Sequence, residues 1–141
     1  MSKIAVVYWS GTGNTEAMAN LVVEGAKAAG AEADLFTAAD FNEGIVADYS
    51  AIAFGCPSMG AEQLEDSEFE PMFDSVKSSL KDKTIGLFGS YGWGDGEWMR
   101  TWQEDCESLG AKIADDAIIC SGEPNSEISD DLKDLGKTLA K

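Results

Sequence analysis

Short, continuous apolar runs recur along the chain, and segments with helical periodicity separate them. Continuous rather than alternating hydrophobicity is typical of strands buried on both faces of a parallel sheet. Such runs predict five strands, over residues 4–8, 33–36, 51–55, 84–88 and 117–120. The alternation of strands with helices predicts an α/β fold in which helices cover both faces of the sheet.

The segments between these runs carry apolar residues at helical spacing. They predict helices over 14–29, 68–80, 97–109 and 126–141, and a poor helix over 41–46. Trp98 and Trp102 are four residues apart on one predicted helix, a spacing that favours core packing over ligand contact. In an open sheet of this kind, ligands bind outside the carboxyl ends of the strands, at the point where the strand order reverses.

The chain has 141 residues, of which 44% are hydrophobic, enough for one domain with a real core over 1–141. Its three cysteines form no Cys-x-x-Cys pair, which disfavours a disulfide framework or a structural zinc site. The early apolar run is too short for a signal-peptide core, and no run approaches the ~20 residues of a membrane span. We therefore expect a cytoplasmic protein with no metal site.

The formal net charge of −16 excludes whole classes of partner. A chain this acidic is repelled by nucleic acid and by anionic membrane surfaces, whereas a protein with a basic face is a suitable partner. Histidine is absent, which excludes Ser–His–Asp and Cys–His catalysis and any metal site built on imidazole.

The loop after the first predicted strand reads Ser10-Gly-Thr-Gly-Asn-Thr15 and enters a helix. The backbone N–H groups at a helix N-terminus lack intrahelical partners, and the helix dipole favours an anion there. The loop lacks the Gly-Lys-Ser/Thr ending of a Walker motif and does not match Gly-x-Gly-x-x-Gly. It also contains no lysine or arginine, so an anion here would be held by neutral dipoles, unless the loop merely caps the helix.

Two further strand-end loops contain chemistry-bearing residues. The first, Cys56-Pro-Ser-Met-Gly-Ala-Glu62, resembles a phosphatase loop only in its cysteine, because Glu62 stands where that chemistry needs an arginine. The second, Ser90-Tyr-Gly-Trp-Gly-Asp-Gly96, places aromatic rings on flexible backbone at a strand end, which suits stacking on a flat ligand. Either loop could instead be an ordinary turn, and Trp9 could belong to the core or to the site.

With these three loops in this order, the sequence resembles the flavodoxin family, in its short-chain type from anaerobic bacteria. The resemblance covers the whole chain and is carried by 10–15, 55–60 and 89–96. It implies a three-layer, doubly wound, five-stranded parallel sheet in the order 2-1-3-4-5. It also implies one non-covalently held FMN.

The resemblance assigns roles residue by residue. The positions matching the phosphate contacts are Ser10, Thr12, Asn14 and Thr15. Trp93 matches the aromatic on the outer flavin face, and Met59 matches the residue on the inner face. Gly60 matches the glycine whose carbonyl turns toward flavin N5–H in the semiquinone, and Glu62 matches the acid near the N3 edge. The other implied cofactor-binding positions are Gly11, Gly13, Pro57, Ser58, Ala61, Ser90, Tyr91, Gly92, Gly94 and Gly122. Some relatives have Ser at Pro57, an acid at Ala61 and Asn at Gly122.

The implied function is that of a low-potential electron carrier, not an enzyme, cycling mainly between semiquinone and hydroquinone. Carboxylates near the flavin would make the fully reduced anion harder to form. Acids beside two of the loops suggest a docking surface for a monomer that meets basic redox partners, such as flavodoxin or ferredoxin reductases and low-potential oxidoreductases. The acids concerned are Glu62, Glu65, Asp66, Glu68, Glu70, Asp95 and Glu97.

Two other functions remain to be weighed. An FMN-dependent NAD(P)H:quinone oxidoreductase needs a second substrate pocket, and the chain is near the minimum length for the fold. A phospho-receiver domain needs clustered acids at the first and third strand ends and a lysine after the fifth. The residues at those places are Trp9-Ser10, Gly55-Cys56 and Ser121-Gly122, which lack that chemistry.

Overall fold

The computed structural model describes residues 3–11, 13–58, 64–65, 67–92, 96–114 and 117–140. Its strands are β1 (Lys3–Tyr8), β2 (Glu32–Thr37), β3 (Ala51–Gly55), β4 (Thr84–Tyr91), β5 (Lys112–Ile113) and β6 (Ile118–Ser121). Its helices are α1 (Asn14–Ala28), α2 (Glu43–Val46), α3 (Phe69–Val76), α4 (Glu97–Ser108) and α5 (Ser126–Leu139). Two 3-10 turns, η1 (Ala38–Asp40) and η2 (Lys77–Ser79), complete the described elements.

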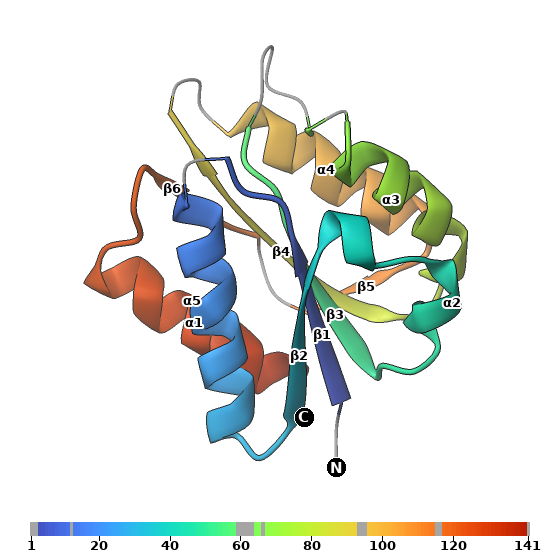
Figure 1. Ribbon diagram of the computed structural model, residues 1–141, viewed down its shortest axis with the longest axis horizontal. Coiled ribbons are helices and arrows are strands. Elements are labelled where there is room, and N and C mark those ends of the chain that lie inside the picture. The colour runs from blue at the N-terminus through green and yellow to red at the C-terminus, as the bar shows by residue number, and fades with distance from the viewer. Residues whose placement is uncertain are drawn as a thin grey trace.

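The strands pair in parallel in the order β2-β1-β3-β4-β5, which confirms the expected strand order (Figure 1). At the β4 edge of the sheet, two short strands replace the single fifth strand that the sequence predicts. The strand β5 pairs with the start of β4, and β6 pairs with its end. Two residues separate Ile85 from Phe88 in β4, whereas four residues separate their partners Ile113 and Ile118 in the edge segment. Two extra residues therefore interrupt the edge ladder, and a two-residue strand carries too little pattern to be predicted.

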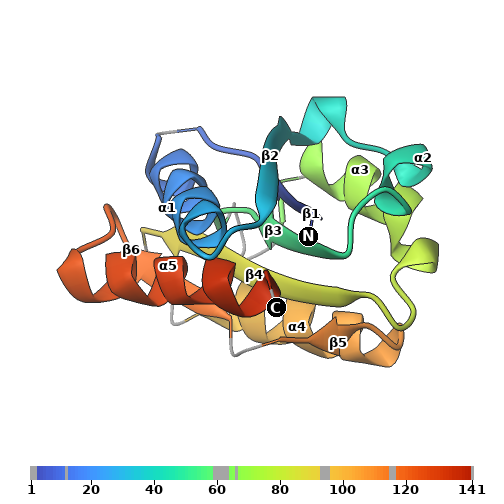
Figure 2. The same cartoon turned by 90° about the horizontal axis from the view of Figure 1, so that it is seen from below.

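Helices cover both faces of the sheet, with α1 and α5 on one side and α2, α3 and α4 on the other (Figures 1 and 2). Successive residues of β1 alternate between the two cores: Ile4 and Val6 pack with the α1–α5 side, and Ala5 and Val7 with the α3–α4 side. This is the period of two expected of a strand buried on both faces.

Aromatic rings fill the α3–α4 side of the core. Phe54 of β3 meets Phe73 edge-to-face at 5.3 Å, and Phe69 meets Trp102 edge-to-face at 5.4 Å. Trp98 and Trp102 are both 2% exposed, so the four-residue spacing correctly predicted two core residues. Among the described residues, no helix has the length and apolar character needed to cross a bilayer.

The helices α1 and α5 pack against each other through two glycines. A Cβ on Gly136 would overlap the carbonyl oxygen of Val22, and a Cβ on Gly25 would overlap that of Lys133. The two backbones therefore approach more closely than any larger residue would allow. Because both atoms in each overlap belong to main chains, no side-chain movement can relieve it.

We expect Gly136→Ala to lower the free energy of unfolding by about 1–3 kcal/mol, because overpacking against backbone forces the helices apart. In an open helix the same change would be stabilising, because Ala has the higher helix propensity. Chemical denaturation measures the effect, and Asn20→Ala on the exposed face of α1 is the control that should be neutral or stabilising. A Gly136→Ala protein as stable as wild type would contradict this packing.

Candidate functional site

The carboxyl ends of β1, β3, β4 and β6 lie at one edge of the sheet, and main-chain hydrogen bonds continue beyond their paired residues. Trp9 N donates to Gly55 O at 3.1 Å, and Ser58 N donates to Ser90 O at 3.0 Å. At the end of the edge strand, Gly122 N donates to the carbonyl of Tyr91 at 3.2 Å. These bonds bring four loops that are distant in sequence to the same place.

The four loops enclose a strand-end hollow of about 400 Å³, within the ~300–1,000 Å³ of typical small-molecule sites. Its lining residues are Trp9, Gly11, Asn14, Pro57, Ser58, Ser90, Tyr91, Gly92 and Gly122. All except Trp9 were among the expected cofactor-binding positions. No lysine or arginine is among these described lining residues, so the hollow offers an anion only neutral donors.

Several expected positions lie elsewhere or outside the described residues. Thr15 is 1% exposed, and its hydroxyl is hydrogen-bonded to that of Ser90 at 2.9 Å, which joins the first loop to the end of β4. Ser10 and Gly13 line a neighbouring hollow instead. Thr12, Met59, Gly60, Ala61, Glu62, Trp93 and Gly94 lie outside the described residues, as do the predicted docking acids Asp66 and Asp95.

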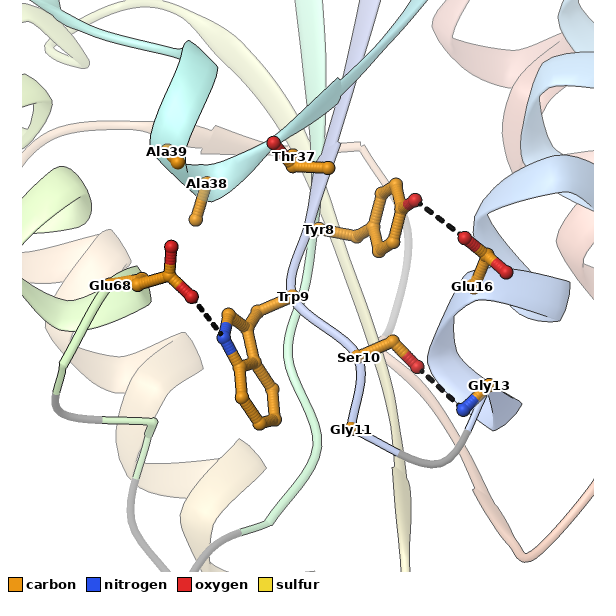
Figure 3. A pocket seen from close by; sticks show the side chains of 10 residues that line it. All are labelled: Tyr8, Trp9, Ser10, Gly11, Gly13, Glu16, Thr37, Ala38, Ala39 and Glu68. Carbon is orange, nitrogen blue, oxygen red and sulfur yellow. Dashed lines mark hydrogen bonds between the residues drawn. The ribbon is translucent and has the colours of Figure 1, made fainter.

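The neighbouring hollow, of about 470 Å³, lies beside the 10–15 loop and shares Trp9 and Gly11 with the strand-end hollow (Figure 3). Two hydrogen bonds flank it. The Tyr8 hydroxyl donates to Glu16 Oε2 at 2.8 Å, and Trp9 Nε1 donates to Glu68 Oε1 at 3.0 Å. Tyr8 and Trp9 are consecutive and point to opposite sides of β1, so the strand end reaches both α1 and the start of α3.

A hydrogen bond between Ser10 and Gly13 stabilises the turn that precedes the N-terminus of α1. Ser10 Oγ accepts the Gly13 N–H at 3.0 Å, and Gly13 has φ 96°, a left-handed conformation that favours glycine. No side chain among the described residues caps this helix. A Cβ on Gly13 or Gly92 would meet no atom within 4 Å, so both glycines border open space. The first turn of α1 therefore has backbone donors available to an anion.

Glu65 anchors the start of α3 from a buried position, with 4% of its surface exposed. Burial alone would raise the pKa of this carboxyl, but donors from Ser67, Phe69 and Glu68 together hold the pKa below its usual range. Its own N–H donates to Cys56 Sγ at 3.3 Å. The expectation that Glu65 belongs to an exposed docking surface is therefore wrong, because its carboxylate caps a helix.

The thiol of Cys56 is fully buried, and burial raises its pKa to about 12. Its carbonyl accepts the Trp98 Nε1–H at 3.2 Å, and a Cβ on Gly89 would overlap the same carbonyl oxygen. Cys56 thus serves as a packed junction between the β3 loop, β4 and α4. This agrees with the sequence argument that it is not a nucleophile.

Comparison with known proteins identifies relatives over nearly the whole chain. The family model described as flavodoxin matches residues 6–134. A flavodoxin from Megasphaera elsdenii is 47% identical over 138 residues, 98% of each chain, and one from Clostridium beijerinckii is 39% identical over 135 residues, covering 96% of this chain and 97% of that one.

Solved structures give the same result. The solution structure of two-electron reduced Megasphaera elsdenii flavodoxin superposes with a TM-score of 0.90 at 46% identity, covering 97% of this chain and 98% of that chain. A flavodoxin from the domain Archaea has a TM-score of 0.85 at 24% identity, a level at which the likeness concerns the fold alone.

The Glu65 cap predicts a pH-dependent stability difference. Glu65→Gln removes the charged acceptor and should lower the free energy of unfolding near neutral pH by about 1–3 kcal/mol. Because the folded-state pKa is depressed, this contribution is present above the ordinary carboxyl pKa of 4.5 and is lost as the pH falls through the folded value. Wild type and variant should therefore converge in acid. Denaturation from pH 3 to 7, with the exposed Glu70→Gln as control, measures this, and a pH-independent difference would contradict it.

The buried thiol of Cys106 predicts that the free energy of unfolding falls in base, whereas the Glu65 contribution is lost in acid. Burial raises the pKa of Cys106 to about 12, above the 9.0 of an ordinary thiol. The folded state therefore holds the thiol proton more tightly, and stability should fall as the pH rises from about 9 toward 12. Cys106→Ala should lose less stability than wild type over this range, in denaturation curves at pH 7 and pH 10.5. All other groups are the same in both proteins, so parallel losses would show that Cys106 is not the cause.

Proposed function

The chain belongs to the flavodoxin family of FMN-binding electron-transfer proteins, and we propose that it carries electrons at low potential between protein partners. Its bound FMN would cycle mainly between the one-electron-reduced and the fully reduced states. The observation that carries the proposal is the strand-end hollow, where four loops meet without a lysine or arginine among the described lining residues.

The described residues fit FMN at both ends of that hollow. At one end, Asn14 and the uncapped first turn of α1 offer neutral donors to a phosphate, with the Thr15 hydroxyl behind them against Ser90. At the other end, Pro57, Tyr91 and Gly92 provide apolar and flat surfaces for a ring system. Open space beside Gly92 and Gly122 leaves room that side chains would fill. Thr12, Met59, Gly60, Ala61, Glu62, Trp93 and Gly94 are proposed contacts by resemblance alone.

When bound, FMN supplies the one-electron chemistry of the proposed carrier. The chain's own part is to hold the cofactor on strand ends of one rigid sheet and to set the charge around it. Ladder hydrogen bonds from Trp9 and Ser58 fix two of the walls directly to the neighbouring strands. The positions of these two walls therefore depend on the sheet and not on side-chain contacts.

The charges near the hollow favour a low potential. Glu16 and Glu68 line the neighbouring hollow, and no cation among the described residues lines either hollow. One negative charge about 10 Å away, at an effective dielectric of ~20, opposes an added electron by about 1.7 kcal/mol. For a one-electron step this is about 70 mV, before screening by salt.

The lysines at three strand starts support docking at the opposite edge of the sheet, where the strand-end hollow lies. Lys3 begins β1, Lys83 precedes β4 and Lys112 begins β5, all at the opposite edge of the sheet from the hollow. The exposed acids at the start of α3 include Glu68, which lines the neighbouring hollow, and Glu70, which lines a groove between α3 and α4. A partner with a basic face would therefore be steered toward the cofactor end.

An anaerobic reductive titration of the holoprotein, followed by visible spectra, tests the proposed redox cycle. We expect two separated one-electron steps, the second at a clearly lower potential, because negative surroundings penalise the fully reduced anion most. A single two-electron step would contradict the proposal. Bleaching of the flavin by NAD(P)H without a protein partner would instead favour a quinone oxidoreductase.

Salt dependence tests the docking surface. Electron transfer with a basic-faced reductase should slow as the ionic strength rises, since salt screens attraction between exposed charges. Glu70→Gln should reduce the rate at low salt and weaken the salt dependence. Glu24→Gln, an exposed carboxylate midway along α1, is the matched control. Rates that do not respond to salt would contradict this surface.

A further inference from the structure

The indole of Trp9 forms a wall between the two hollows. It lines both of them, together with Gly11 (Figure 3). The ring lies against the 10–15 loop, because a Cβ on Gly11 would come within 3.1 Å of Trp9 Cη2 and 3.3 Å of Cζ3. The placement of this ring therefore determines how much room the Gly11 end of the loop has.

The Trp9 ring is oriented from outside the loop. Its Nε1–H donates to Glu68 Oε1 at 3.0 Å, across 59 positions of sequence. The backbone of Glu68 is itself held, because its N–H donates to Glu65 Oε1 at 2.8 Å. Glu65 is buried, and its N–H donates to Cys56 Sγ. The start of α3, which carries the Glu68 acceptor, is therefore anchored to the core.

We propose that Glu68 is a positioning residue for phosphate binding: its hydrogen bond holds the Trp9 indole against Gly11 and so sets the position of Gly11 beside the proposed phosphate site. This inference rests on the proposed function, since the phosphate in question is that of FMN. Without the bond, the indole has other rotamers open to it, and the loop loses the surface that packs on Gly11.

The charge of Glu68 and its hydrogen bond to Trp9 should have opposite effects on phosphate affinity, so the two effects can be tested separately. The Glu68 carboxylate lines the same hollow as Ser10 and Gly13, so its charge repels an anion held by the first turn of α1. Removing the charge alone should therefore strengthen phosphate binding or leave it unchanged. Removing the hydrogen-bond acceptor should weaken it. Glu68→Gln does the first and keeps an acceptor oxygen, whereas Glu68→Ala does both.

The experiment measures dissociation constants of FMN and of riboflavin, which lacks the phosphate, from the flavin fluorescence released on dilution of the loaded full-length chain. We expect Glu68→Ala to weaken FMN binding about three- to tenfold, the range of one modest hydrogen bond. Glu68→Gln should bind FMN at least as tightly as wild type, to within twofold. Riboflavin affinity should stay within twofold in both variants. Glu24→Ala, which removes an exposed charge on α1, is the control for net charge.

A double-mutant cycle identifies Trp9 as the intermediary. Trp9→Phe keeps a ring and removes the donor, so it should weaken FMN binding as Glu68→Ala does. The double variant should then bind no more weakly than the weaker single variant. Additive losses, equal losses for FMN and riboflavin, or wild-type affinity in Glu68→Ala would each overturn the inference. If wild type fails to bind FMN at all, the proposed function fails instead, so the two failures are distinguishable.

Discussion

The register of the parallel ladder determines where every wall of the hollow stands. The strands β1, β3, β4 and β6 each end at a paired residue, and main-chain hydrogen bonds continue one to three residues beyond that end. Cys56 N donates to Phe88 O, Ser58 N to Ser90 O and Gly122 N to Tyr91 O. Because these donors and acceptors are backbone groups, no single side chain decides the arrangement. A register shift would also turn each strand's buried side chains to the wrong face, so the core enforces the geometry of the site.

The position of α1 depends on a different constraint, the close contact of its backbone with α5. Gly25 and Gly136 allow that contact, and small residues such as Ala51 and Ala53 on the same side of the sheet let both helices lie close to it. The packing of α1 against α5 sets the direction of its N-terminus. The first turn of α1 begins in the 10–15 loop. The proposed anion binding at one end of the helix would thus depend on packing along its whole length.

Most of the fold could be predicted from the sequence because it follows from local periodicity. The continuous run at 51–55 and the helical spacing of Trp98 and Trp102 each describe a segment within its own length. The errors concern residues whose role depends on distant contacts. The edge strand is split because β4 extends to Tyr91 and pairs with two separate segments. The same limit applies to the site, where Glu65 resembles its exposed acidic neighbours in sequence and differs only in accepting several hydrogen bonds.

Tyr8 at the end of β1 and Trp9 directly after it show how an acidic chain can place carboxylates beside the proposed anion site. Successive side chains of a strand point to opposite faces, so Tyr8 reaches α1 and Trp9 reaches α3. Each donates a hydrogen bond to a glutamate, Glu16 on one side and Glu68 on the other. Burial, followed by the bond to Glu16, raises the pKa of Tyr8, so its hydroxyl keeps the proton that it donates. Tyr8 and Trp9 thereby hold both carboxylates beside the hollow, and in the proposed function their charge opposes reduction of the cofactor while the helix N-terminus stays open to its phosphate.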